Sequence, residues 1–256
     1  MTTNDHRIAF VHIPRTAGTT FGVYLDGLYA GRKAAKFYAD ELHPVVNAKV
    51  DAFRELDADE KASFELLRGH FVYGFDDGES GCRYLTLLRE PVARLVSYYF
   101  YALKERTHYL HTYLFQRRIG LERFLMSDAS IDLDNSQVRA ISGATFASSR
   151  ERVTEAHLEL AKRNLLERFA AFGLTEQFDV SMQRFSRAFG WPLPAQERRN
   201  EGAYARDMTL SDACRAYVEE KNRFDIELYR FATAHFESAA AYSERAADPA
   251  IQTIGS

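Results

Sequence analysis

The stretch Ile8-Ala-Phe-Val-His-Ile-Pro-Arg-Thr-Ala-Gly-Thr-Thr-Phe21 decides the fold of this chain. Residues 8–13 are apolar apart from one histidine, as expected for a strand buried on both faces of a parallel sheet. Pro14 ends this strand, and a short loop of small and polar residues follows it. Apolar side chains then recur with helical spacing, at Phe21, Tyr24, Leu25 and Leu28. The unit predicted here is strand, tight loop, helix.

The same unit recurs along the chain. Residues 84–88 are typical of a second buried strand, and Pro91 suits the first turn of the helix that follows it. Residues 170–174 read as a third strand. A capping box, Ser148-x-x-Glu151, is expected to open the helix that precedes this strand.

Helices are also predicted over 177–189 and, singly or as a pair, over 209–236. Strands that alternate with helices predict an α/β fold: a single domain over 1–236 with a central, mostly parallel sheet and helices on both faces. Residues 237–256 are rich in Ala and Ser and are expected to form a flexible tail.

Composition excludes several classes of protein. The chain has 256 residues, of which 46% are hydrophobic and 27% charged, which is the composition of an ordinary globular domain. Its net charge of -3 argues against a nucleic-acid binder. Cys82 and Cys214 lie too far apart in sequence to indicate a disulfide framework or a zinc site. No signal peptide or run of about 18 apolar residues is visible, so a cytoplasmic protein without a membrane span is expected.

The loop after the first strand has the features of an anion-binding site. A turn between a strand and a helix directs backbone N–H groups at one point, where the helix dipole adds positive charge. Threonine hydroxyls and the Arg15 guanidinium add donors, and Thr19 or Thr20 is expected to cap the helix. The loop is P-loop-like but not a Walker A motif, because Thr19 rather than lysine follows Gly18.

Residues 10–21 resemble the H-I-P-K-T-[AG]-G-[ST] signature of sulfotransferases, in the carbohydrate group that includes heparan sulfate 2-O-sulfotransferases and many bacterial members. The resemblance implies that this loop binds the 5′-phosphosulfate of the co-substrate 3′-phosphoadenosine 5′-phosphosulfate (PAPS). The implied cofactor-binding residues are Arg15, Thr16, Ala17, Gly18, Thr19 and Thr20. A second motif, Leu88-Arg89-Glu-Pro91-x-x-Arg94-x-x-Ser97, resembles the family segment that holds the 3′-phosphate, with Arg89 and Ser97 as its ligands.

Three weaker similarities follow in family order. They are Asn135-x-Gln-x-Arg139-x-x-Ser-Gly143, Gly173-Leu-Thr-Glu-x-Phe-Asp179 and Asn222-x-x-Asp225-x-x-Leu-Tyr229. With these, the resemblance covers residues 8 to 232, which is most of the chain.

Sulfuryl transfer to a hydroxyl needs a base, and His70 is the residue that the resemblance implies. It lies in Arg68-Gly-His-Phe-Val-Tyr-Gly74, between the two cofactor motifs, and an imidazole has a pKa near neutrality. Arg15 is the second expected catalytic residue, although the family commonly has lysine there. Arginine can neutralise charge on the transferring group but cannot usefully donate a proton. Neither His108 nor His111 has companions at metal-ligand spacing, so no metal is expected.

Arg199 lies in a basic segment after a proline-rich break and is expected to contribute to a lid over the cofactor. The function predicted from the sequence is a PAPS-dependent sulfotransferase acting on a small-molecule or carbohydrate acceptor. Two alternatives stay open: a P-loop-like kinase of a nucleotide or small molecule, and a non-catalytic protein that binds an anion or 3′-phosphoadenosine 5′-phosphate (PAP). The sequence leaves the acceptor and the oligomeric state undetermined.

Overall fold

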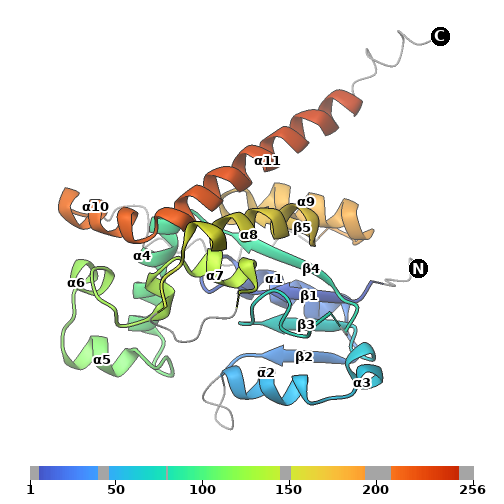
Figure 1. The fold of residues 1–256 in the computed structure, drawn as a ribbon, viewed down its shortest axis with the longest axis horizontal. Helices are drawn as coiled ribbons and strands as arrows, with labels where there is room; N and C mark the ends of the chain where they lie inside the picture. Colours follow the sequence, from blue (N-terminus) through green and yellow to red (C-terminus); the bar gives the residue numbers. More distant parts are fainter. Residues whose placement is uncertain (1–5, 40–45, 79, 145–150, 194–208, 248–256) are drawn as a thin grey trace.

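Five parallel strands form the central sheet of the computed structural model, in the order β2-β3-β1-β4-β5 (Figure 1). The structure describes residues 6–39, 46–78, 80–144, 151–193 and 209–247. The strands are β1 (Ile8–Val11), β2 (Ala34–Phe37), β3 (Leu66–Gly69), β4 (Arg83–Leu88) and β5 (Phe169–Leu174). The predicted α/β fold with a parallel sheet is confirmed.

Apolar side chains on both faces of β1 explain why helices cover the sheet on both sides. Ile8 and Phe10 pack on one face, against α1 (Gly18–Leu28) and α9 (Phe178–Phe189). Ala9 and Val11 pack on the other face, in a core shared with four helices. These are α2 (Val46–Arg54), α7 (Ser136–Ser142), α8 (Glu155–Glu167) and α11 (Arg223–Ala247).

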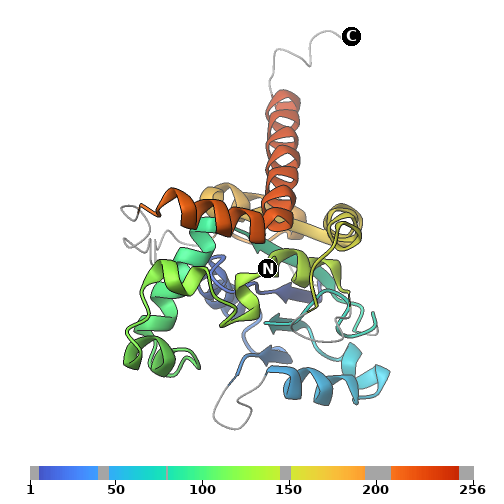
Figure 2. The same ribbon diagram turned by 60° about the vertical axis from the view of Figure 1, so that its left-hand side comes forward.

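A second group of helices forms its own core beyond the carboxyl ends of the strands (Figure 2). It consists of α4 (Pro91–Lys104), α5 (His111–Gln116), α6 (Leu121–Leu125) and α10 (Asp212–Lys221). The remaining short helices are α3 (Ala58–Ala62), η1 (Ile131–Leu133) and η2 (Thr175–Gln177). No helix in the described ranges is long and apolar enough to cross a bilayer.

The structure corrects several local expectations. Strands β2 and β3 were not predicted: β2 lies partly exposed at the sheet edge, and the short apolar run of β3 ends at Arg68 and Gly69. Ala17, not a threonine, is the N-cap of α1, and Thr154 caps α8 in a capping box with His157. The expected cap residue Ser148 lies outside the described residues. Helix α11 continues to Ala247, past the predicted domain end at residue 236 (Figure 1).

Candidate functional site

All five strands end at the same edge of the sheet, and a polar residue directly follows each of them, Thr175 in the case of β5. His12 follows β1, Tyr38 follows β2, His70 follows β3 and Arg89 follows β4. In an open parallel sheet this edge is where ligands bind. Since β1 lies between β3 and β4, the two histidines and Arg89 come from three neighbouring strands.

The loop between β1 and α1 has an unusual backbone. Arg15 and Ala17 have positive φ angles of 71° and 61°, in the left-handed region that side chains rarely adopt. Among the described residues, no side chain caps α1, and its first turn contains no acidic residue. A helix start without a side-chain cap or an acidic residue is suited to binding an anion.

Gly18 is required by His12 rather than by its own dihedral angles. A Cβ atom at residue 18 would lie 2.0 Å from Cδ2 and 2.1 Å from Nε2 of His12. The His12 imidazole therefore packs directly against the first residue of α1. It also stacks against Phe10, with 5.6 Å between ring centroids.

The two motifs that the sequence predicts to bind the cofactor meet through Arg15. Its Nε donates to Oγ of Ser97, 3.0 Å away, and its guanidinium carbon lies 4.5 Å from the centre of the Tyr101 ring. Nη1 of Arg89 donates to the backbone carbonyl of Arg15 at 3.1 Å. The structure thus brings together three residues predicted from separate motifs: Arg15, Arg89 and Ser97.

The two guanidinium groups make this point positively charged, although the nearby Glu176 and Glu90 carboxylates partly oppose the lowering of the Arg89 pKa. Burial and the neighbouring Arg89 lower the pKa of Arg15, and burial likewise lowers the pKa of Arg89. Within the part of the chain that is described, neither guanidinium forms a salt bridge; the Glu90 carboxylate instead accepts hydrogen bonds from the N–H groups of Val92 and Ala93. Two partly buried cations without a paired carboxylate are a favourable environment for a bound anion.

His70 is held in a single tautomer. Its Nδ1 lies 2.7 Å from the carbonyl oxygen of His12, and a carbonyl can only accept, so Nδ1 carries the proton and Nε2 is the basic nitrogen. Burial lowers the pKa of His70 below its usual value, although the bond to His12 partly opposes the shift. The ring is therefore neutral near pH 7, as a general base must be.

Gly69 explains how the chain brings His70 to this place. It has a φ of 153°, and a Cβ atom there would lie 2.3 Å from the carbonyl oxygen of Phe37. No other residue fits between β2 and β3 at this position. The backbone N–H of His70 then donates to the same carbonyl at 2.9 Å.

The motifs at residues 135–143 and 222–229 bond to each other, and the first of them also bonds to the backbone of Arg89. The buried Gln137 side chain exchanges two hydrogen bonds with the Arg89 backbone, at 3.0 and 2.9 Å. The fully buried Asp225 carboxylate accepts from the N–H groups of Gln137 and Val138. Asn135 and Asn222 also bond reciprocally to each other's backbone segments. These motifs have a structural role at the site.

The third weak motif supports the same strand end. The Thr175 hydroxyl donates to the carbonyl of Leu88 at 2.9 Å, and the Glu176 carboxylate accepts from the N–H of Glu90 at 3.0 Å. Both neighbours of Arg89 are therefore held by residues that follow β5.

The remaining predicted residues lie in different environments. The Thr16 hydroxyl is buried and donates to the carbonyl of Ile13 at 2.8 Å, so its side chain serves the loop itself. Thr19 is exposed, whereas Ala17 and Thr20 are half-buried. Arg199 and the expected lid lie outside the described residues.

Sequence reasoning missed Tyr38 and gave Arg68 no role. Arg68 donates at 3.0 Å to the hydroxyl of Tyr38, which lies 2.9 Å from Nδ1 of His12. The signal for Arg68 was its place in the Arg-Gly-His segment. Tyr38 follows an unpredicted strand, so nothing in the sequence singled it out.

Other features of the described residues lie apart from this site. Two surface hollows of about 450 and 540 Å³ share Leu103 and Phe115 on the α4–α5 side, and no site residue lines them.

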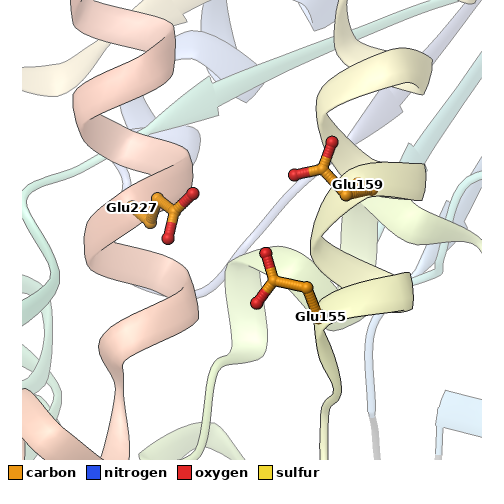
Figure 3. Close-up of side chains that lie close together, drawn as sticks. All are labelled: Glu155, Glu159 and Glu227. Carbon is orange, nitrogen blue, oxygen red and sulfur yellow. The ribbon is translucent and has the colours of Figure 1, made fainter.

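Glu155, Glu159 and Glu227 come together between α8 and α11 (Figure 3). All three are exposed, and Nζ of Lys162 lies 2.7 Å from Glu159 and 2.6 Å from Glu227, so an ion-pair network accounts for this group without a metal.

Comparison with known proteins adds one distant relative. The chain is 27% identical over 181 residues to the heparan-sulfate 6-O-sulfotransferase 3 of Mus musculus. The similarity is to a sulfotransferase. The match covers 60% of this chain and 38% of the relative, so the chain spans well under half of that protein. No family model matches the sequence. The name of the relative describes sulfuryl transfer to a 6-O position. The motifs in the sequence resemble the carbohydrate group that includes 2-O-sulfotransferases.

Proposed function

We propose that this protein is a PAPS-dependent sulfotransferase that transfers a sulfuryl group to an acceptor hydroxyl. One observation carries the proposal: the start of α1, Arg15, Arg89 and a neutral His70 converge at the carboxyl edge of the sheet. The distant similarity to a sulfotransferase supports the same activity.

The residues have distinct roles in this proposal. The N–H groups at the start of α1 and the Arg15 guanidinium bind the phosphosulfate, and Arg89 and Ser97 bind the 3′-phosphate. As the acceptor oxygen bonds to sulfur, its proton moves to Nε2 of His70, and the sulfur–oxygen bond to the 5′-phosphate breaks. Negative charge then builds on the leaving PAP, where Arg15 stabilises it.

Ligand binding distinguishes this function from the kinase alternative. PAP at 100 times its Kd should stabilise the protein by about 2.7 kcal/mol, which a thermal shift detects, and ATP with Mg²⁺ should not match it. A larger shift with ATP would favour the kinase, and no shift with PAP would remove the proposal.

Variants separate catalysis from binding alone. Transfer of labelled sulfate from PAPS to a panel of carbohydrate and small-alcohol acceptors should be lost in His70→Ala, while PAP binding is kept. Arg15→Ala should abolish transfer and Arg15→Lys should keep at least about a tenth of it, since lysine retains the charge. Arg163→Ala, which removes an exposed arginine on α8, serves as the matched control. Full transfer by Arg15→Ala would refute its role, and PAP binding without transfer to any acceptor would indicate a binding protein.

A further inference from the structure

A hydrogen-bond chain runs from the surface of the protein to the His12 imidazole. The Asp26 carboxylate accepts two bonds from Arg68, at 2.8 and 2.6 Å, and one from Lys36 at 2.8 Å. Nη1 of Arg68 donates to the Tyr38 hydroxyl at 3.0 Å, and this hydroxyl lies 2.9 Å from Nδ1 of His12. The chain thus links α1, β3 and the residue after β2 to the residue after β1.

The direction of each bond follows from the chemistry of the groups. A guanidinium only donates, so the Tyr38 oxygen accepts from Arg68 and its own hydrogen is left to donate. Burial raises the pKa of Tyr38, so the hydroxyl keeps that hydrogen. Among the described residues, His12 Nδ1 is the one group at hydrogen-bond distance that can accept it. A neutral imidazole that accepts at Nδ1 carries its proton on Nε2.

The His12 ring is neutral for independent reasons. Its side chain is 8% exposed, and burial together with the nearby His70, Arg68 and Arg15 holds its pKa well below the usual value. A third positive charge beside Arg68 and Arg15 would be unfavourable. The tautomer with hydrogen on Nε2 is therefore the one that fits these surroundings.

The protonated nitrogen lies at the start of α1. The Cδ2–Nε2 edge of the ring packs against Gly18, the first residue of that helix. Among the described residues Nε2 has no hydrogen-bond partner, whereas Nδ1 is occupied. The His12 side chain is more than nine-tenths buried, and its Nε2–H has no partner among the described residues beside an uncapped helix start, which indicates a ligand with an acceptor oxygen.

We propose that His12 binds an oxygen of the phosphosulfate through its Nε2–H, and that Tyr38 and Arg68 are positioning residues that fix this tautomer. The identity of the ligand rests on the proposed function; the tautomer does not. His12 and His70 then form a complementary pair with ring centroids 4.7 Å apart. His12 presents a hydrogen to the anion, and His70 presents a lone pair to the acceptor hydroxyl.

The tautomer is measurable without any ligand. Long-range proton–nitrogen spectra of protein with ¹⁵N-labelled histidine should show His12 with bare Nδ1 and protonated Nε2, and His70 with the opposite pattern. Each signal is assigned by its loss on substitution. Tyr38→Phe should shift the His12 pattern toward a mixture of tautomers. Tyr99→Phe, which removes a buried hydroxyl bonded to the Ile119 carbonyl, should leave it unchanged.

Two substitutions of His12 test the donor itself. A glutamine amide nitrogen can reach the place of Nε2, whereas an asparagine amide reaches only the place of Nδ1. His12→Gln should bind PAP within about threefold of the wild type, and His12→Asn about tenfold to a hundredfold more weakly, as expected for a lost bond to a charged group. Calorimetry gives these affinities.

Each outcome is decisive. A proton on Nδ1 of His12, or equal affinity of His12→Asn and the wild type, overturns the inference. If the wild type itself fails to bind PAP, the proposed function fails, and titration with inorganic sulfate then tests His12 alone. A change in the Nε2 chemical shift on adding sulfate supports His12 as an anion donor, and no change refutes it.

Discussion

A methyl group at residue 18 should destabilise the protein through a collision with His12. A Cβ atom there would lie 2.0 Å from the imidazole Cδ2, well inside van der Waals contact, and the ring is held by Tyr38 and Phe10. Overpacking of this kind costs about 1–3 kcal/mol. Alanine recovers about 0.5–1 kcal/mol through its helix propensity. Gly18→Ala should therefore lower the free energy of unfolding by up to about 2.5 kcal/mol.

The same helix supplies a matched control. Gly27 also lies in α1, and a Cβ atom there would meet nothing within 4 Å. Gly27→Ala should stabilise the protein by about 0.5–1 kcal/mol, because only the propensity gain remains. Urea denaturation measures both variants, and the two should differ by about 1–3 kcal/mol.

A double-mutant cycle identifies His12 as the group in collision. In the His12→Ala background the ring is gone, so Gly18→Ala should lose most of its cost, with a coupling of about 0.5–3 kcal/mol. Equal stability of Gly18→Ala and Gly27→Ala, or strict additivity with His12→Ala, would show that the ring does not pack against residue 18. In that case the His12 ring would not lie at the start of α1, and the proposed contact between Nε2 and the anion would be refuted.

Further predictions concern pH, the network behind Arg89 and the acidic cluster. Because burial lowers the pKa of His70, kcat/KM should rise with pH through a midpoint below 6.5 and level off near neutrality; a midpoint above 6.5 would contradict a buried neutral base. The free energy of unfolding should be greatest above about pH 6.5 and fall as pH drops through the lowered pKa values of His12 and His70, because the unfolded chain binds protons first. Denaturation of wild type and His12→Gln across this range should show a shallower fall in the variant, and parallel curves would argue against the His12 contribution. Asn135→Ala should cost about 1–3 kcal/mol, since it leaves two buried N–H groups without an acceptor, whereas removal of the exposed Asp128 carboxylate should cost less than about 1 kcal/mol; similar costs in denaturation would refute the distinction. Mn²⁺ or Ca²⁺ should leave the Tm unchanged, because Lys162 already binds two of the three clustered carboxylates, and a rise in Tm would reveal a metal site.

The sequence predicted three of the five strands and missed the other two. Strands β1, β4 and β5 and helix α9 were predicted within one or two residues. Strand β2 was missed because two of its four residues are exposed at the sheet edge, and β3 because its short apolar run ends at Arg68 and Gly69. The helix cap was misassigned because the left-handed Ala17 depends on how the loop is packed.

The sequence singled out the charged and basic residues of the candidate site, but not the residues that hydrogen-bond to them and hold them in place. Arg15, Arg89 and Ser97 stand in recognisable motifs, and the structure brings them together. Tyr38 has no motif, since its role depends only on the strand that precedes it. Thr16, by contrast, was predicted from its motif to contact the ligand, but its hydroxyl donates to the carbonyl of Ile13 within the loop.

The sequence by itself predicted a parallel α/β sheet, the strand–loop–helix unit near its centre and the charged and basic residues of the proposed site. Those properties depend on hydrophobic runs and on residues adjacent in the chain, so they can be read locally. Only the tertiary structure decided which ring nitrogen carries the proton in His12 and in His70. That choice depends on the Tyr38 hydroxyl and the His12 carbonyl, which reach the two rings from separate strands. A hydrogen bond between strands far apart in sequence leaves no local pattern, and it alone fixes which imidazole donates and which accepts.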